Sequence, residues 1–115
     1  MGERSIADIL DAAADLIEPE GAWTQGHIRR DAKGKYTALP GHAVCWCTVG
    51  ATLAVAGLAA SMSADRFLAS FLGLDGVDAV EQWNDAPERT QAEVVAKLRE
   101  AAALARTKEA EANHA

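Results

Sequence analysis

One uncharged segment sets the architecture that the rest of the chain must complete: His42-Ala-Val-Cys-Trp-Cys-Thr-Val-Gly-Ala-Thr-Leu-Ala-Val-Ala-Gly-Leu-Ala-Ala60. After its opening histidine, its only polar side chains are two threonines and two thiols. No polar face can be drawn around it, and a helix that is apolar on every side is normally buried on every side. The segment therefore predicts a buried central helix over about 43–60.

Size and composition favour one small helical domain. The 115 residues fit a single domain over 1–115 with one core. Half of the residues are hydrophobic but only 5% are aromatic, because alanine supplies much of the apolar share. Alanine favours helix, so the composition predicts a mainly α fold.

The net charge of the chain argues against some classes of binding partner. The net charge of −6 argues against a general nucleic-acid-binding surface, which needs a basic field. Residues 23–40 are the exception, since four bases and one acid give them +3. The basic residues there are Arg29, Arg30, Lys33 and Lys35. They could contact a phosphate or an acidic partner, but the favoured interpretation is that they are the solvated side chains of a hairpin.

The same apolar segment is a poor membrane span. It is rich in alanine, glycine and threonine, and no Lys or Arg closely flanks it, so a core helix is favoured over a lipid-embedded one. The chain also lacks a basic stretch followed by a leucine-rich one, so no secretory signal is expected. Two thiols at Cys-x-Cys spacing then suggest reduced cysteines and a cytoplasmic location.

The first and last helices are marked by caps and apolar stripes. Ser5 and Asp8 predict a helix start, and Glu18-Pro19 predicts its end. Thr90 to Glu93 forms a capping box for the last helix. The predicted buried stripe of that helix is Val94, Val95, Leu98, Ala101, Ala102 and Ala105. Beyond Arg106 the apolar side holds only alanine, so a frayed tail is expected over about 107–115.

The segments between these helices predict a hairpin and two short helices. Asp31 and Gly34 suit the ends of a tight turn, which predicts a β-hairpin over about 25–39 that pairs 25–30 with 35–39. Ser63 and Gly73 suit the start and stop of a third helix, and Asp75 suits the cap of a fourth that ends near Trp83. The predicted fold is a compact bundle of four to five helices around 43–60, with a small hairpin.

Three motifs in order resemble a family of short bacterial and phage-encoded proteins that is grouped only as a domain of unknown function. The motifs are Leu16-Ile17-x-Pro19-x-Gly21-x-Trp23-x-Gln25-Gly26, then Trp46-Cys47-x-x-Gly50-Ala51, and then Trp83-Asn84-Asp85 with Arg89-Thr90-x-x-Glu93-Val94. The likeness spans roughly Ile6 to Leu98. It implies a location in the cytoplasm of a bacterium or a phage-infected cell, and no activity.

The cysteines suggest two chemistries. Cys45 and Cys47 could ligate a metal, with His42 and His27 as further ligands. However, residues two apart on a helix point in nearly opposite directions, and a structural zinc needs four ligands. We therefore expect no metal site and no cofactor. Alternatively, a thiol in the first turn of a helix would have a lowered pKa, and His42 could act as its base. Small buried thiols without chemistry are the simpler interpretation.

Two tryptophan-containing loops supply the predicted binding residues. These residues are Trp23, Gln25, Trp83, Asn84, Asp85 and Arg89. Trp and Arg are common interface anchors, so the loops could form one rim of a binding site. Polar groups at helix ends also commonly satisfy the backbone, and that structural role is the favoured alternative.

The sequence therefore predicts a small, soluble, non-enzymatic interaction or regulatory protein that binds another protein through its acidic helices or its Trp-rich loops. A phage-encoded inhibitor of a host defence complex would be a specific form of this function. The alternatives are a small cysteine-dependent enzyme and a homodimeric helical subunit that uses the alanine-rich last helix as its seam.

Overall fold

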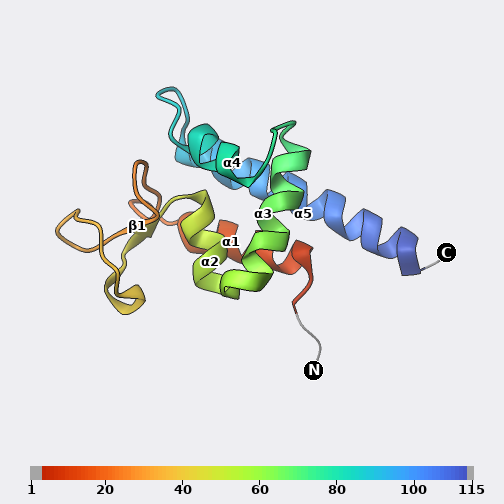
Figure 1. Ribbon diagram of the computed structural model, residues 1–115, viewed down its shortest axis with the longest axis horizontal. Helices are drawn as coiled ribbons and strands as arrows, with labels where there is room; N and C mark the ends of the chain where they lie inside the picture. The colour runs from red at the N-terminus through yellow and green to blue at the C-terminus, as the bar shows by residue number, and fades with distance from the viewer. Residues whose placement is uncertain (1–3, 114–115) are drawn as a thin grey trace.

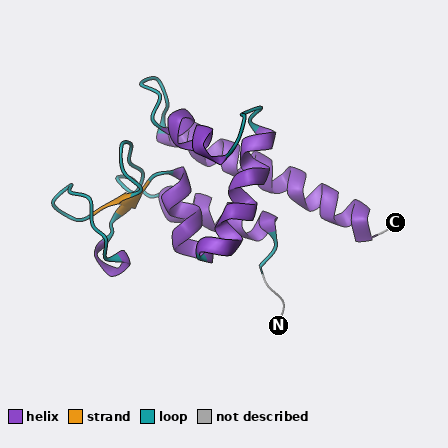
Figure 2. Cartoon of the chain, in the orientation of Figure 1, coloured by secondary structure: helices purple, strands orange, loops and turns teal. Residues whose placement is uncertain are grey.

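The computed structural model describes residues 4–113 and is mainly α-helical, as predicted (Figures 1 and 2). Within that range it contains five α-helices, one 3-10 turn and one antiparallel pair of two-residue strands. In chain order the elements are α1 (Ile6–Ile17), β1 (Arg29–Arg30), η1 (Pro40–His42), β2 (Cys45–Trp46), α2 (Thr48–Ala56), α3 (Leu58–Phe71), α4 (Val77–Asn84) and α5 (Gln91–Asn113). None of the helices in this range is long and apolar enough to cross a membrane.

The helix at the centre of the core is α1. Its cap is the predicted one, since the Ser5 hydroxyl accepts a hydrogen bond from the Asp8 N–H at 3.0 Å. Its apolar stripe is buried against α2, α3 and α5. The buried residues of α1 are Ala7, Ile9, Leu10, Ala13, Ala14 and Ile17.

The longest helix, α5, lies beside α1 (Figure 1). Thr90 caps it as predicted, because its hydroxyl accepts a hydrogen bond from the Glu93 N–H at 3.1 Å. All six residues of the predicted stripe are buried, and the small alanines among them allow the two helices to approach closely. The helix continues to Asn113, beyond the point from which fraying is predicted; positions 114–115 lie outside the described residues.

The prediction of one buried helix over 43–60 is wrong. The segment is instead divided between strand β2, helix α2 and the start of α3. The N–H groups of Val44, Trp46 and Cys47 bond to the carbonyl groups of Arg30, Ala22 and Ile28, which removes them from any helix. Gly57, at a φ of 82°, then separates α2 from α3. Nor is the segment dry throughout, since Val44 is 50% exposed and Leu58 is 70% exposed.

A two-stranded antiparallel hairpin is present, but its second strand is not 35–39. Arg29 pairs with Trp46 and Arg30 with Cys45. The predicted turn does form, with the Gly34 N–H donating to the Asp31 carbonyl oxygen at 2.9 Å. Only one bridge, between Arg30 and Tyr36, joins the two predicted strands. We call residues 27–44 the arm. In Figure 1 this segment is coloured orange to yellow and extends away from the helices.

Helices α3 and α4 both form, but each begins at a different residue from the one predicted. Helix α3 begins at Leu58 rather than Ser63, directly after the glycine that ends α2. It stops beside Gly73 as predicted, at a φ of 74°. Helix α4 has Gly76 at its N-cap, and the predicted Asp75 cap makes no side-chain hydrogen bond there. These shifts leave the order of elements unchanged.

Candidate functional site

Asn84 joins three separate parts of the chain. Its side chain is fully buried at the end of α4. Its Oδ1 accepts hydrogen bonds from Trp23 Nε1 at 2.8 Å, from the Thr48 N–H at 3.0 Å and from Thr48 Oγ1 at 2.7 Å. Its Nδ2 donates to the Thr24 carbonyl oxygen at 3.1 Å and to Asp85 Oδ1 at 3.0 Å. One amide thus ties the loop after α1 and the first residue of α2 to the end of α4.

Gln25 and Asp85 reinforce the same junction. Gln25 Nε2 donates to the carbonyl oxygens of Asn84 and Ala86, both at 2.9 Å. Asp85 Oδ1 accepts from the Gly26 N–H at 3.0 Å. The final carbonyls of a helix have no partner within it, so these bonds supply an end cap for α4 from a segment about 60 residues away in sequence.

Trp83 and Arg89 form the outer part of the cluster. The Arg89 guanidinium carbon lies 4.3 Å from the centroid of the Trp83 ring, within cation–π range. Arg89 Nε donates to the Trp83 carbonyl oxygen at 2.8 Å, and its Nη1 pairs with Glu93 Oε2 at 2.8 Å. The arginine therefore closes the turn between α4 and α5.

The structure brings together all six residues that the sequence predicts for binding. We call this cluster the joint: Trp23, Gln25, Trp83, Asn84, Asp85 and Arg89. Every member makes a contact within the chain, and most of the bonds satisfy backbone groups or the buried amide. The joint holds no thiol, hydroxyl nucleophile or histidine, so its evident chemistry is to hold three segments rigidly.

Cys47 is the N-cap residue of α2, and its sulfur accepts a hydrogen bond from the Gly50 N–H at 3.3 Å. Burial raises the pKa of the Cys47 thiol from 9.0 to about 11, and the hydrogen bonds from the backbone only partly oppose this rise. The thiol is therefore protonated at neutral pH. The lowered pKa expected from the helix terminus is not found, because the desolvation of the sulfur is the larger effect.

Gly50 accounts for the closeness of α2 to the loop before β1. A Cβ atom at this position would collide with the carbonyl group of Ile28. That carbonyl oxygen also accepts the Cys47 N–H at 3.2 Å. The Trp46-Cys47-x-x-Gly50 motif is thus explained by a close backbone contact.

His42 and Cys45 do not complete a reactive centre with Cys47. Cys45 is buried in β2, whereas His42 is exposed in η1. No hydrogen bond joins His42 to either sulfur within residues 4–113. In the same range, no three His, Cys, Asp or Glu side chains are placed to hold a metal ion.

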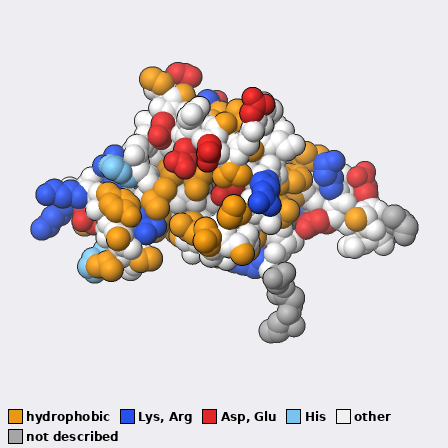
Figure 3. Space-filling view, in the orientation of Figure 1, with side chains coloured by type: hydrophobic (Ala, Val, Ile, Leu, Met, Phe, Trp, Pro, Cys, Tyr) orange, Lys and Arg blue, Asp and Glu red, His pale blue; other side chains and the backbone are white. Residues whose placement is uncertain are grey.

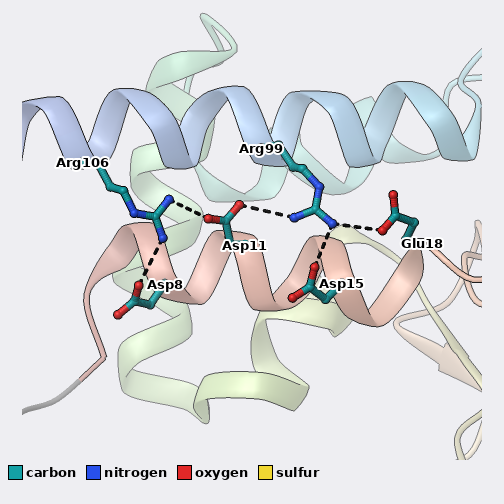
Figure 4. Close-up of polar contacts among 6 residues, drawn as sticks. All are labelled: Asp8, Asp11, Asp15, Glu18, Arg99 and Arg106. Atoms are coloured by element: carbon teal, nitrogen blue, oxygen red, sulfur yellow. Dashed lines mark hydrogen bonds and ion pairs between the residues drawn. The ribbon is translucent and has the colours of Figure 1, made fainter.

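Two arginines of α5 pair with the four carboxylates of the acidic face of α1 and partly neutralise it (Figure 4). Arg99 pairs with Asp15 at 2.8 Å and with Glu18 at 3.0 Å. Arg106 pairs with Asp11 at 2.6 Å and with Asp8 at 3.2 Å. Exposed ion pairs stabilise a fold only weakly, but together these pairs occupy the carboxylates that a basic partner would contact.

The arm holds a surface that the sequence analysis missed. Its exposed large hydrophobic side chains are Tyr36 at 49%, Leu39 at 57% and Val44 at 50%. Lys33 and Lys35 are exposed beside them, and neither forms an ion pair within the part of the chain that the structure describes. Apolar and basic groups are thus displayed together on one short segment.

Two arginines brace the arm. Arg30 donates to Thr24 Oγ1 and to the carbonyl oxygens of Gly34 and Gln25, each at 2.9 Å. Arg29 donates to the carbonyl oxygens of Thr37 and Ala38 at 2.9 and 3.2 Å. Both arginines are half-buried and bonded to carbonyl groups, so they are structural and not solvated as predicted. Two adjacent arginines in a predicted strand could have signalled this structural role, but the carbonyl groups to which they bond cannot be read from the sequence.

Comparison with known proteins gives one positive result. No curated protein and no solved structure matches the chain. The family of unknown function DUF6197 matches residues 1–104, which is most of the sequence. The chain therefore belongs to the DUF6197 family of unknown function.

Proposed function

We propose that this protein is a small, non-enzymatic interaction protein that binds another protein through its arm. The observation that supports this function is the exposure of Tyr36, Leu39 and Val44 on the segment that also carries Lys33 and Lys35, two lysines that form no ion pair within residues 4–113. Several large apolar side chains exposed on one short segment are more typical of an interaction surface than single scattered ones. The location that we propose is the cytoplasm of a bacterium or a phage-infected cell. If a phage carries the gene, inhibition of a host defence complex is the specific form we propose.

The bracing of the arm supports a binding role. A partner that meets a flexible loop must fix it, which costs about 0.5–1.5 kcal/mol for each immobilised side chain. Arg29 and Arg30 already hold the arm to itself and to the loop that carries Thr24 and Gln25. The joint holds that loop to α4 in turn. We therefore assign the joint to positioning and the arm to contact with the partner.

The other two functions receive less support. Thiol catalysis needs a thiolate, and burial raises the pKa of Cys47 well above neutral. A dimer through α5 would need its alanine face, but Ala101, Ala102 and Ala105 are buried within the chain. The acidic helix α1 is also less suited to a partner, because its carboxylates pair with Arg99 and Arg106.

A matched pair of double variants tests the proposed function. The arm variant combines Lys35→Glu with Leu39→Ser. The control combines Lys108→Glu with Leu104→Ser, which changes an exposed lysine and an exposed leucine on α5. Tagged proteins are used for affinity capture from cells that carry the gene. One protein in near-stoichiometric amount should be recovered with the wild type and the control and lost with the arm variant. Equal recovery with both variants would contradict the assignment of binding to the arm.

A further inference from the structure

A pocket lies between the base of the arm and the helices. Its volume is about 560 Å³, within the roughly 300–1,000 Å³ usual for sites that enclose a ligand group. Leu16 from α1, Trp46 from β2 and Leu53 from α2 form half-buried apolar walls. Pro40 and Ala54 are exposed at its edge, so the pocket opens at the surface of the molecule.

One charged group lines this apolar space. Arg29 belongs to the pocket wall, and its Nε and Nη2 are already committed to the carbonyl oxygens of Thr37 and Ala38. Its Nη1 donates to no acceptor within residues 4–113. A guanidinium whose orientation is fixed on one edge and whose other edge still has donors is suited to a carboxylate.

The arm that borders the pocket carries a net positive charge, the same sign as Arg29. Residues 23–40 carry four basic residues and one acidic residue in a chain of net charge −6. On the face shown in Figure 3, hydrophobic side chains gather over α2 and the arm, and Lys and Arg side chains lie at the outer end of the arm. The excess of +3 in residues 23–40 already includes the negative charge of Asp31, whose Oδ1 accepts the backbone N–H groups of Lys33 and Lys35.

We propose that this pocket receives one large apolar side chain from an acidic segment of the partner protein, while Arg29 binds a carboxylate next to that side chain. The apolar walls contribute the burial energy, and the guanidinium fixes the orientation of the segment. Lys33 and Lys35 attract the remaining acidic residues. The inference rests on the proposed function, since it specifies the partner chemistry that the arm recognises.

Synthetic peptides test this recognition directly. The probe is a capped 12-residue peptide of Asp and Glu with one central Phe, titrated calorimetrically into the whole protein. Ala54→Trp fills the pocket from an exposed position of α2, and Ala103→Trp is the control at an exposed alanine of α5. The wild type and the control should bind alike, and Ala54→Trp should weaken binding by at least about tenfold. Replacing the central Phe by Ala, or the acids by Lys, should have a similar effect.

A second measurement needs no change in the protein. A peptide whose Phe is replaced by benzoylphenylalanine should cross-link on illumination to Trp46 or to residues 53–55. Equal affinity of the wild type and Ala54→Trp, cross-links elsewhere, or no peptide binding by the wild type would each overturn the inference. If any of these results occurs while the arm variant still loses its captured partner, the proposed function stands and only the pocket assignment fails. If the peptide binds in the pocket but the arm variant captures the partner as well as the wild type does, the proposed function fails instead.

Discussion

Replacing Asn84 by alanine should destabilise the protein by several kcal/mol without touching any exposed surface. The side chain is fully buried and makes five hydrogen bonds. Its loss leaves the Thr48 N–H and hydroxyl without an acceptor in a fully buried position. Trp23 and Thr24 are half-buried, so water can compensate part of their loss.

The magnitude follows from the number of groups left unpaired. A buried donor without a partner costs about 1–3 kcal/mol, and Thr48 alone has two. With a smaller contribution from Trp23 and Thr24, we expect a loss of about 3–5 kcal/mol. Against a typical total stability of about 5–15 kcal/mol, that loss is a large fraction.

Urea denaturation followed by far-UV circular dichroism measures this loss as a lower midpoint at an unchanged slope. Gln82→Ala, an exposed position on the same helix, is the control and should change the stability by less than about 0.5 kcal/mol. A loss below about 1 kcal/mol for Asn84→Ala would refute the role of the amide as the link between α4, α2 and the loop after α1.

Three further changes test other contacts. Gly50→Ala should cost about 1–3 kcal/mol in urea denaturation, because the new Cβ meets the Ile28 carbonyl group; Gly41→Ala, with open space around its Cβ, should be nearly neutral, and equal effects would refute the close contact. Burial raises the pKa of Asp65 from 3.8 to about 6, so the folded state holds the proton of the Asp65 carboxyl group more strongly than the unfolded chain does. The stabilising contribution is therefore complete below about pH 4 and is lost as the pH rises through about 6, by up to about 3 kcal/mol. Asp65→Asn should remove that component from the difference in unfolding free energy between pH 4 and pH 7.5, and an unchanged pH dependence would contradict it. Iodoacetamide at pH 7.5 should label Cys47 quickly only after denaturation, because burial raises its pKa to about 11; rapid labelling of the folded protein would revive thiol chemistry.

The sequence predicted those elements whose signals are local. Ser5 with the stripe of α1, and Thr90 with the stripe of α5, each combine a cap with a regular apolar spacing. Such a pattern fits one helix in one orientation. The turn at Asp31 to Gly34 is equally local, since its residues bond to one another.

The segment 43–60 was mispredicted because its uniform apolarity contains no period. An apolar run without polar interruptions fits a buried strand as well as a buried helix. The backbone partners that settle the question for Val44 and Trp46, the carbonyls of Arg30 and Ala22, lie many residues away. Nothing in the sequence indicated that Leu58 would be exposed, because the hydrophobicity of a side chain does not reveal whether other residues cover it.

The candidate site was predicted in part. The predicted binding residues Trp23, Asn84 and Arg89 lie together in one joint, and their role in binding stays a prediction. The use of the Asn84 amide by Thr48 could not be inferred, since it depends on how α2 meets α4. For the arm, a solvated hairpin was favoured over a binding surface for a related reason: Arg29 and Arg30 look like solvated charges until their carbonyl partners are known.

Photo-cross-linking from the arm in living cells is the most direct test of the assignment of partner binding to this segment. Benzoylphenylalanine is introduced at Tyr36, which is half exposed, and in a second protein at Gln82, which is exposed on α4. Illumination of cells that carry the gene should give one discrete cross-linked species from position 36 and none of that mass from position 82. The same species from both positions, or a species from position 82 alone, would contradict the assignment of partner binding to the arm.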